Sequence, residues 1–388
     1  MKTYRLVIAS VAWFCFVPIS GTDAAGTKKV VYVDDSAAEG GDGTAARPAR
    51  TIQEGISLLP NAGGKVLVHP GTYLGPILVQ RNRVHIQGLA NPVYDADGFL
   101  TGFTSDDASD QEVVITIDRP LVDVGEFGES EDLIEIRGDD NQVRNVVVLV
   151  PAGTAEGGFT SALSAKAEDG QFYHAIEFRN IIVRGAVGNT AWTRKANVLF
   201  DSITALDGGF VGFNPTANGH VTMRKVDVAN NFFANVWFLG LWEFPGSQNG
   251  PSLLTSVIKD SRLRNAANFG LLVMGQGNQT NPAAETTVAV TAKNNRFEGN
   301  LFGINVQPVF DGPPNTARRS LFLGVKDNTY IANTVDARVI FRHFFGDAGD
   351  AFVRDSTVAV KDSDGVFPSP ADVDLGPPEN GNLYVLEH

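Results

Sequence analysis

Apolar and polar residues alternate with a period of two along most of this chain. Runs such as Ile176–Arg179, Val198–Asp201 and Val221–Arg224 place an apolar side chain at every second position. A period of two predicts β-strands rather than helices, because successive side chains of a strand point to opposite sides. The runs are short and are separated by bends rich in Gly, Asn and Asp, so we expect an all-β fold.

One short pattern returns four times in the C-terminal part of the chain. Each copy carries a lysine followed by Asp or Asn, and the steps between these lysines are 34, 33 and 35 residues. The four are Lys259, Lys293, Lys326 and Lys361. This period indicates an array of stacked units, each burying its apolar side only against its neighbours. Because each unit holds three short strands, we expect a parallel β-helix of about ten coils.

Residues that recur in every unit are interpreted as architecture. The Lys-Asp pairs are expected to form a ladder of turn residues. Asn300 and Asn333 occupy another shared column, and we expect an internal amide ladder that satisfies the backbone of a bend. Near the N-terminus, Thr51-Ile-Gln-Glu54 forms a capping box, and a short amphipathic helix is expected to cover the open end of the solenoid.

The first 25 residues have the pattern of a signal peptide. Lys2 and Arg5 precede an apolar run and then small residues, and the run is too short to span a membrane. A buried N-terminal helix is the alternative interpretation. The sequence therefore predicts an exported protein, secreted or periplasmic, with no membrane span after signal removal. We expect a β-helix domain over residues 26–367 and a loose tail or C-terminal cover over residues 368–388.

Charge and cysteine content restrict the partners. The only cysteine, Cys15, lies inside the predicted signal peptide, so the mature chain is expected to have no disulfide. A formal net charge of −13 argues against binding nucleic acid or an anionic membrane by bulk charge. A polyanionic partner would need a local strip of basic residues or a bridging cation.

Several N-terminal segments carry a family resemblance. They are Tyr-Val-Asp-Asp (32–35), Gly-Asp-Gly-Thr (41–44), Pro-Ala-Arg-Thr-Ile-Gln-Glu-Gly-Ile (48–56) and Val-His-Pro-Gly-Thr-Tyr (68–73). Together with the later repeats they resemble right-handed parallel β-helix proteins of the pectate-lyase-like superfamily. The resemblance implies that fold and extracellular polysaccharides as partners. The superfamily includes lyases, hydrolases, epimerases and binding proteins, so the fold alone selects no activity.

The candidate catalytic residues follow from the alternation in the three aligned strands. If their apolar residues face the core, Arg179, Asp201 and Arg224 point outward from adjacent coils. We expect this charged strip to be local, because the places judged equivalent in later coils carry no charge. Those places are Val257, Thr291, Gly324 and Ala359.

Such a strip is typical of an anion-handling site. In the lyases that this chain resembles, arginine or lysine removes the proton next to a uronate carboxylate. The resemblance therefore makes Arg224 the candidate base, with Arg179 and Asp201 handling the carboxylate directly or through a cation. The alternative is a surface ladder of ion pairs with little effect on stability.

Other residues extend the site or offer different chemistry. Trp242 and Trp237 are candidates for stacking on a sugar ring, with packing in the core as the alternative. His220 begins the strand of Arg224 and is a further candidate for substrate binding or proton transfer. Asp201 with Asp207 could instead form the carboxylate pair of a glycoside hydrolase.

The cofactor prediction is open, with calcium as the candidate. Asp95-Ala-Asp97-Gly98 has the carboxylate content of a calcium loop, and a solvated acidic loop is the alternative. No His or Cys cluster has the spacing of a metal site. The sequence favours a polysaccharide lyase acting on an acidic polysaccharide. The alternatives are a non-catalytic β-helix that binds glycans or builds a surface, and a glycoside hydrolase.

Overall fold

The computed structural model describes most of the mature chain predicted above. The described residues are 29–106, 111–121, 131–151, 160–168, 170–185, 188–240, 252–275, 285–308, 318–342 and 355–388. The predicted signal peptide and Trp242 lie outside them. None of the helices in these ranges is long and apolar enough to cross a membrane.

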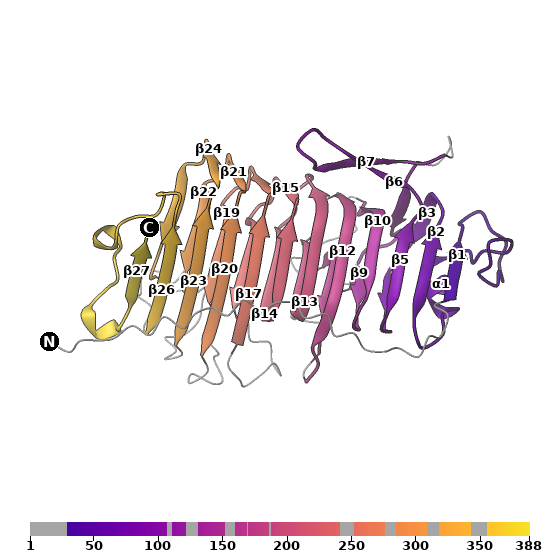
Figure 1. Cartoon of the computed structure of the whole chain (residues 1–388), viewed down its shortest axis with the longest axis horizontal. Helices are drawn as coiled ribbons and strands as arrows, with labels where there is room; N and C mark the ends of the chain where they lie inside the picture. The colour runs from indigo at the N-terminus through magenta and orange to yellow at the C-terminus, as the bar shows by residue number, and fades with distance from the viewer. Residues whose placement is uncertain are drawn as a thin grey trace.

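A single parallel sheet of 25 strands winds around one core, and the chain is a parallel β-helix (Figure 1). Its strands stack along the solenoid into three parallel β-sheet faces, here called faces 1, 2 and 3. Face 1 is formed by β1 (Lys29–Val33), β2 (Gly64–Val68), β5 (Val84–Gly88), β10 (Gln142–Leu149), β12 (Tyr173–Arg184), β13 (Asn189–Ala205), β14 (Val211–Arg224), β17 (Ser252–Lys259), β20 (Thr286–Lys293), β23 (Arg319–Lys326), β26 (Ser356–Asp362) and β27 (Leu383–Glu387).

Faces 2 and 3 are built in the same way, and the long strands of face 1 continue into them. Face 2 holds β3 (Gly71–Leu74), β8 (Val113–Thr116), β15 (Asp227–Ala229), β18 (Arg262–Arg264), β21 (Arg296–Glu298) and β24 (Thr329–Ile331). Face 3 holds β4 (Ile77–Val79), β9 (Asp132–Ile136), β11 (Ser161–Lys166), β16 (Ala234–Gly240), β19 (Phe269–Gly275), β22 (Phe302–Gln307) and β25 (Val335–Val339).

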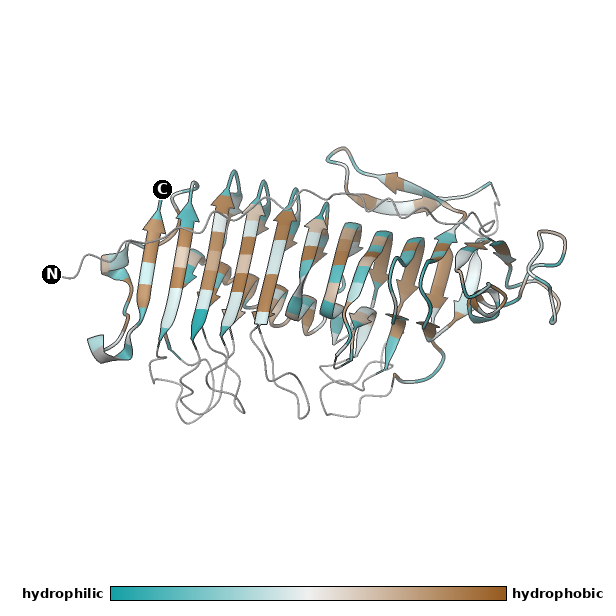
Figure 2. Ribbon diagram, turned by 60° about the horizontal axis from the view of Figure 1, so that its bottom comes forward, coloured by the Kyte–Doolittle hydropathy of each residue, from teal (hydrophilic) through white to brown (hydrophobic). Residues whose placement is uncertain are grey.

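The alternation of apolar and polar residues places apolar side chains inside the solenoid and polar side chains on its surface. In Figure 2 hydrophobic and hydrophilic residues alternate along many of the strands. The inward side chains form one continuous core, in which Phe178 stacks on Phe200 of the next coil with ring centroids 5.4 Å apart. The predicted alignment of β12, β13 and β14 is confirmed by their register.

At the corner between faces 1 and 2, one residue in each coil changes the direction of the chain. That residue has left-handed backbone geometry, with φ between 51° and 59° in seven consecutive coils. The residues are Asn145, Asn180, Ser202, Lys225, Asp260, Asn294 and Asp327. Asn and Asp tolerate this conformation better than most residues, which explains why the repeat carries Asp or Asn after its lysine.

The amide ladder expected at Asn300 and Asn333 is confirmed. The Asn300 Nδ2 donates to the Asn333 Oδ1 at 3.0 Å and to the carbonyl of Leu263 at 3.0 Å. The Asn300 Oδ1 accepts from the backbone N–H of Ala266 at 2.9 Å. The buried backbone of the corner between faces 2 and 3 is therefore satisfied by side chains.

Both ends of the described solenoid carry additional elements. The helix α1 (Ile52–Ser57) is preceded by the N-cap residue Thr51, which forms a capping box with Glu54, and the helix packs against β1, β2 and β4. At the other end, 3-10 turns η1 (Pro370–Asp372) and η2 (Pro378–Asn380) precede β27, which pairs with β26. The segment after Phe367 is thus a C-terminal cover that adds a strand, not a loose tail.

A hairpin of β6 (Asn91–Tyr94) and β7 (Leu100–Thr104) stands apart from the main sheet. In Figure 1 it lies along the top of the solenoid. The hydroxyl of Tyr94 donates to the Asn180 Oδ1, and the hydroxyl of Thr204 donates to the carbonyl of Leu100. The hairpin therefore connects the β5 coil to coils far along the stack, and it is called the strap below.

Candidate functional site

The outer side of face 1 brings together three of the predicted catalytic residues. Arg179 of β12 lies in register with Asp201 of β13, which lies in register with Arg224 of β14. Their strand neighbours Phe178, Phe200 and Met223 are buried in the core, so the three charged side chains point outward as expected.

These three residues form one ion-pair network. The Asp201 Oδ2 lies 3.0 Å from the Arg179 Nε and 2.7 Å from the Arg224 Nη2. The Arg179 Nη2 also lies 2.6 Å from an oxygen of Glu177. The Asp201 side chain is only 10% exposed, whereas those of Arg179 and Arg224 are 34% and 39% exposed. The contacts of the ion-pair ladder are therefore present, and both guanidinium groups still reach solvent.

Arg224 does not have the environment of a base. Its hydrogen bond to Asp201 is the main reason that its pKa is raised above the ordinary arginine value. A raised pKa makes the guanidinium harder to deprotonate, which is the opposite of what proton abstraction requires. Asp201 thus holds Arg224 as a fixed cation in this structure, and the role of Arg224 as the base stays a prediction.

The charged strip is longer than the sequence suggested. The register places Arg144 opposite Arg179 and continues from Arg224 to Lys259, Lys293 and Lys326. Val257 was expected to lie opposite Arg224. In the structure it pairs with Thr222, two residues earlier on β14, and Lys259 is the residue opposite Arg224. We call the outward residues Arg144, Arg179, Asp201, Arg224, Lys259, Lys293 and Lys326 the face 1 column.

The recurring lysines of the sequence repeat could have identified the face 1 column. Lys259, Lys293 and Lys326 recur at steps of 34 and 33 residues and end strands that pair in register. The turn residues of the ladder are the Asp or Asn that follow them. Lys361 belongs to a different column, because it pairs with Gly324.

His220 lies on the same side of face 1, four residues before Arg224 on β14. Its Nδ1 is 2.8 Å from the Thr255 Oγ1, and its Nε2 is 3.2 Å from the Thr222 Oγ1. Its backbone N–H donates to the Asn197 Oδ1 at 2.9 Å. Burial lowers the pKa of His220, because an imidazolium would lose hydration there. The histidine is therefore held as a neutral imidazole near neutral pH.

Trp237 does not belong to this site. It lies on β16 of face 3, is 3% exposed and packs edge-on against Phe233 with ring centroids 5.1 Å apart. Its expected role in stacking on a sugar beside Arg224 is thus corrected to packing, the alternative given for it. Trp242, the other tryptophan candidate, lies outside the described residues.

The carboxylate pair of a hydrolase is not supported by the contacts of its members. Asp201 is shared by two arginines, whereas Asp207 follows β13 beyond face 2 and accepts from the backbone N–H of Gly185 at 2.7 Å.

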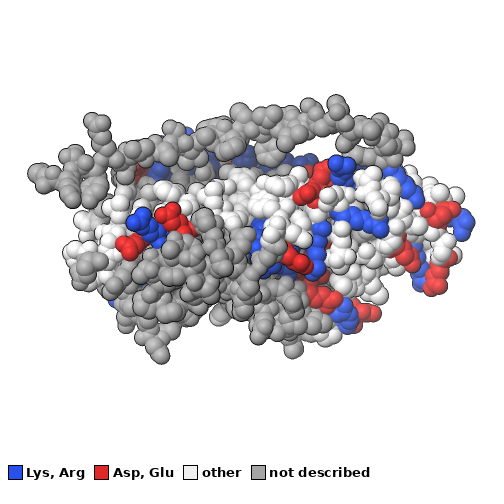
Figure 3. All heavy atoms as spheres, turned by 90° about the horizontal axis from the view of Figure 1, so that it is seen from below, with Lys and Arg blue, Asp and Glu red and all other residues white. Residues whose placement is uncertain are grey.

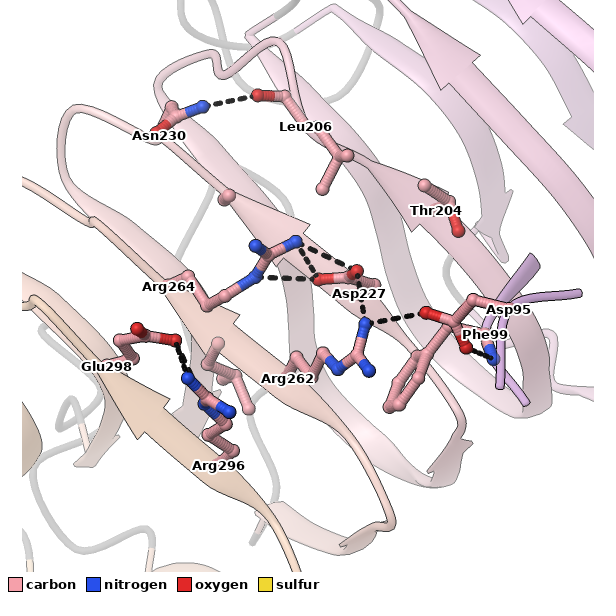
Figure 4. A network of polar contacts seen from close by, with 12 residues as sticks. Asp95, Phe99, Thr204, Leu206, Asp227, Asn230, Arg262, Arg264, Arg296 and Glu298 are labelled. Carbon is pink, nitrogen blue, oxygen red and sulfur yellow. Dashed lines mark hydrogen bonds and ion pairs between the residues drawn. The ribbon is translucent and has the colours of Figure 1, made fainter. Parts of the chain in front are cut away.

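The acidic loop considered for calcium belongs to the strap. Figure 4 shows Asp95 directed at Arg262, and their ion pair measures 2.9 Å. Asp97 also pairs with Arg262, whose guanidinium lies 3.9 Å from the centroid of the Phe99 ring. An arginine takes the place that a cation would occupy between these carboxylates. Within the described ranges, no three His, Cys, Asp or Glu side chains are grouped as a metal site.

The comparisons with known proteins concern the fold. No family model matches the chain, and no curated protein matches it in sequence. Among solved structures, the A-module of the mannuronan C-5 epimerase AlgE6 from Azotobacter vinelandii is 15% identical. It covers 87% of this chain and 94% of its own, with a TM-score of 0.44.

Two further structures have the same kind of similarity. The pectin methylesterase PemA from Erwinia chrysanthemi is 12% identical, with a TM-score of 0.39, and covers 84% of this chain and 95% of its own. An exopolygalacturonase from Thermotoga maritima is 11% identical, with a TM-score of 0.38, and covers 86% of each chain. These neighbours are carbohydrate-active enzymes, and at such identities the likeness assigns no activity to this chain.

Proposed function

We propose that the outer side of face 1 binds an acidic, uronate-containing polysaccharide. The observation that carries the proposal is the face 1 column, in which basic side chains recur on consecutive coils and Asp201 is the acidic member. Adjacent strands lie about 4.8 Å apart, so the column offers a regular row of cations. A polymer with one carboxylate on each sugar presents a matching row of anions.

The chemistry of the column suits this ligand. Arginine can bind a carboxylate through two parallel N–H donors, and Arg179 and Arg224 are both fixed in place by Asp201. Lys293 and Lys326 are exposed and form no ion pair with any residue in the described ranges. By contrast, Figure 3 shows several groups on another side of the molecule in which basic and acidic side chains lie next to one another.

Replacing both Lys293 and Lys326 by serine is expected to weaken binding of the polysaccharide about tenfold, since each exposed charged contact contributes about 0.7 kcal/mol. Titration calorimetry with pectate, alginate and chondroitin oligosaccharides measures the effect, and affinity should fall as salt is raised. Arg296→Ser is the matched control, because Arg296 is exposed on face 2 and pairs with Glu298. Equal affinity of both variants, or equal binding of a neutral glucan, would overturn the proposal.

A lyase activity of the same face is the second candidate, and the environment of His220 favours it. Eliminative cleavage needs a base for the carbon-bound proton beside the carboxylate, and a neutral imidazole can accept that proton. His220 stands about 13 Å along the strand from Arg224, as four residues of a β-strand span this length.

If His220 is this base, His220→Ala should lower kcat/KM at least a hundredfold. The measurement is the ultraviolet absorbance of the unsaturated chain ends on the same acidic substrates. Because burial lowers the pKa of His220 from its ordinary value of 6.5, the acid limb of the pH profile should lie below that pH. His69→Ala serves as the control. Saturable binding without unsaturated ends would leave a binding protein and exclude the lyase.

A further inference from the structure

Face 3 carries a half-buried arginine that has no acidic partner in the part of the chain that the structure describes. Arg338 lies on the outer side of β25, between the core residues Ala337 and Val339. Asp336, two residues before it, accepts instead from the Asn333 Nδ2 at 3.2 Å. Charges that are partly removed from water are normally paired in proteins, so an uncompensated guanidinium calls for an explanation.

Two contacts hold this guanidinium in place. Its Cζ lies 3.6 Å from the centroid of the Phe302 ring, over the ring face. Its Nε donates to the Oδ1 of Asn305, a residue that is 0% exposed, at 2.8 Å. The Asn305 Nδ2 donates to the Gln307 Oε1 at 3.4 Å, and the Gln307 Nε2 donates to the carbonyl of Arg342 at 2.8 Å. The arginine is therefore positioned by the protein alone.

The terminal nitrogens of Arg338 are available to a ligand. Neither Nη1 nor Nη2 donates to any residue within the described ranges, and neither is fully buried. These two nitrogens carry most of the N–H donors of a guanidinium. Two parallel N–H donors match the two oxygens of a carboxylate in distance and direction.

The electrostatics favour an anion at this position. Burial lowers the pKa of Arg338 to about 10, because the charged form loses part of its hydration. The group is still protonated at neutral pH. Arg264 on face 2 shows the usual arrangement, in which the Asp227 carboxylate lies 2.7 Å from its Nη2. A carboxylate supplied by a ligand would give Arg338 the same kind of partner.

We propose that Arg338 binds a carboxylate end-on through its two Nη groups. Asn305 occupies the Nε and Phe302 supports the guanidinium from one side, so little orientation is lost on binding. The carboxylate belongs to a small sugar acid or to a uronate unit of a longer chain. The site lies on face 3, so the inference does not rest on the binding proposed for face 1.

Labelling with phenylglyoxal, followed by peptide mass spectrometry, tests the proposal on the unchanged full chain. The reagent attacks the terminal nitrogens of arginine, so Arg338 should be labelled in the protein alone. Galacturonate at about ten times its Kd should slow this labelling about tenfold. Galactose, which lacks the carboxylate, should leave the rate unchanged. Arg296, exposed on face 2, is the control and should react equally in every arm.

A galacturonate oligosaccharide forms a further arm that identifies the source of the carboxylate. Protection by the oligosaccharide alone assigns the site to a polymer, and protection by galacturonate as well assigns it to a single sugar acid. No protection by either ligand would overturn the proposal. So would equal protection by galactose, or a failure of Arg338 to react in the protein alone.

Variants separate this site from face 1. Replacing both Lys293 and Lys326 by serine should keep the protection of Arg338, even where affinity for a polysaccharide is lost. If the protection disappears with the lysines, the contact at Arg338 is indirect and the inference fails. In that double variant, Arg338→Lys keeps the charge without the paired donors and should bind galacturonate about tenfold more weakly in calorimetry. Unchanged affinity would contradict the end-on contact.

Discussion

Replacing Asn300 by leucine is expected to lower the free energy of unfolding by about 4 kcal/mol. Asn300 is 1% exposed, and its side chain satisfies the N–H of Ala266 and the carbonyl of Leu263. Leucine has a similar volume but leaves both backbone groups buried without a partner. Each such group costs about 1–3 kcal/mol.

Urea denaturation followed by circular dichroism measures this loss. Asn268→Leu is the matched control, because the Asn268 Nδ2 makes a single bond to the carbonyl of Phe232 near the surface. Its loss should stay below about 1 kcal/mol. If the two variants are equally stable, the ladder contributes no more than an ordinary surface amide.

Replacing Asp227 by alanine is expected to lower the free energy of unfolding by about 3 kcal/mol, as for other buried ion pairs that lose one partner. The Asp227 side chain is 6% exposed and takes two contacts from the Arg264 Nη2, at 2.7 and 2.8 Å. Arg262 lies 3.6 Å from the same carboxylate and also holds the strap through Asp95 (Figure 4). Without Asp227, two arginines remain beside each other with no common anion.

Thermal and urea denaturation of Asp227→Ala give its stability, and limited proteolysis reports on the strap. Glu298→Ala is the control from the same region, since its partner Arg296 is 47% exposed. An exposed pair of this kind contributes about 0–1 kcal/mol. A loss for Asp227→Ala no greater than that of Glu298→Ala would show that the network is as weak as a surface pair.

The sequence was sufficient for the fold because the fold depends on local patterns. Period-two alternation predicted the strands, and the recurring lysines predicted the stack. Asn300 and Asn333 predicted the ladder from their spacing alone. These features recur in successive coils of the C-terminal part, so each copy supports the interpretation of the others.

The site was harder to predict because it depends on register and on contacts between distant segments. A shift of two residues along one strand separates Val257 from Lys259 and decides whether the column ends or continues. The strap joins Asp95 to Arg262, 167 residues further along the chain. Trp237 is buried on face 3, and alternation alone gives the side of a strand but not what covers it.

The corner between faces 1 and 2, with its one residue of positive φ per coil, also determines where this protein can accept inserted sequence. Only 23 residues separate Asp201 from Arg224, whereas 35 separate Arg224 from Lys259, yet both pairs are adjacent rungs of one column. The corner from face 1 to face 2 is fixed by a single residue, so the extra length falls between faces 3 and 1. Peptides or whole modules grafted at that corner would hang from the solenoid at a defined rung and leave the rungs on either side in register.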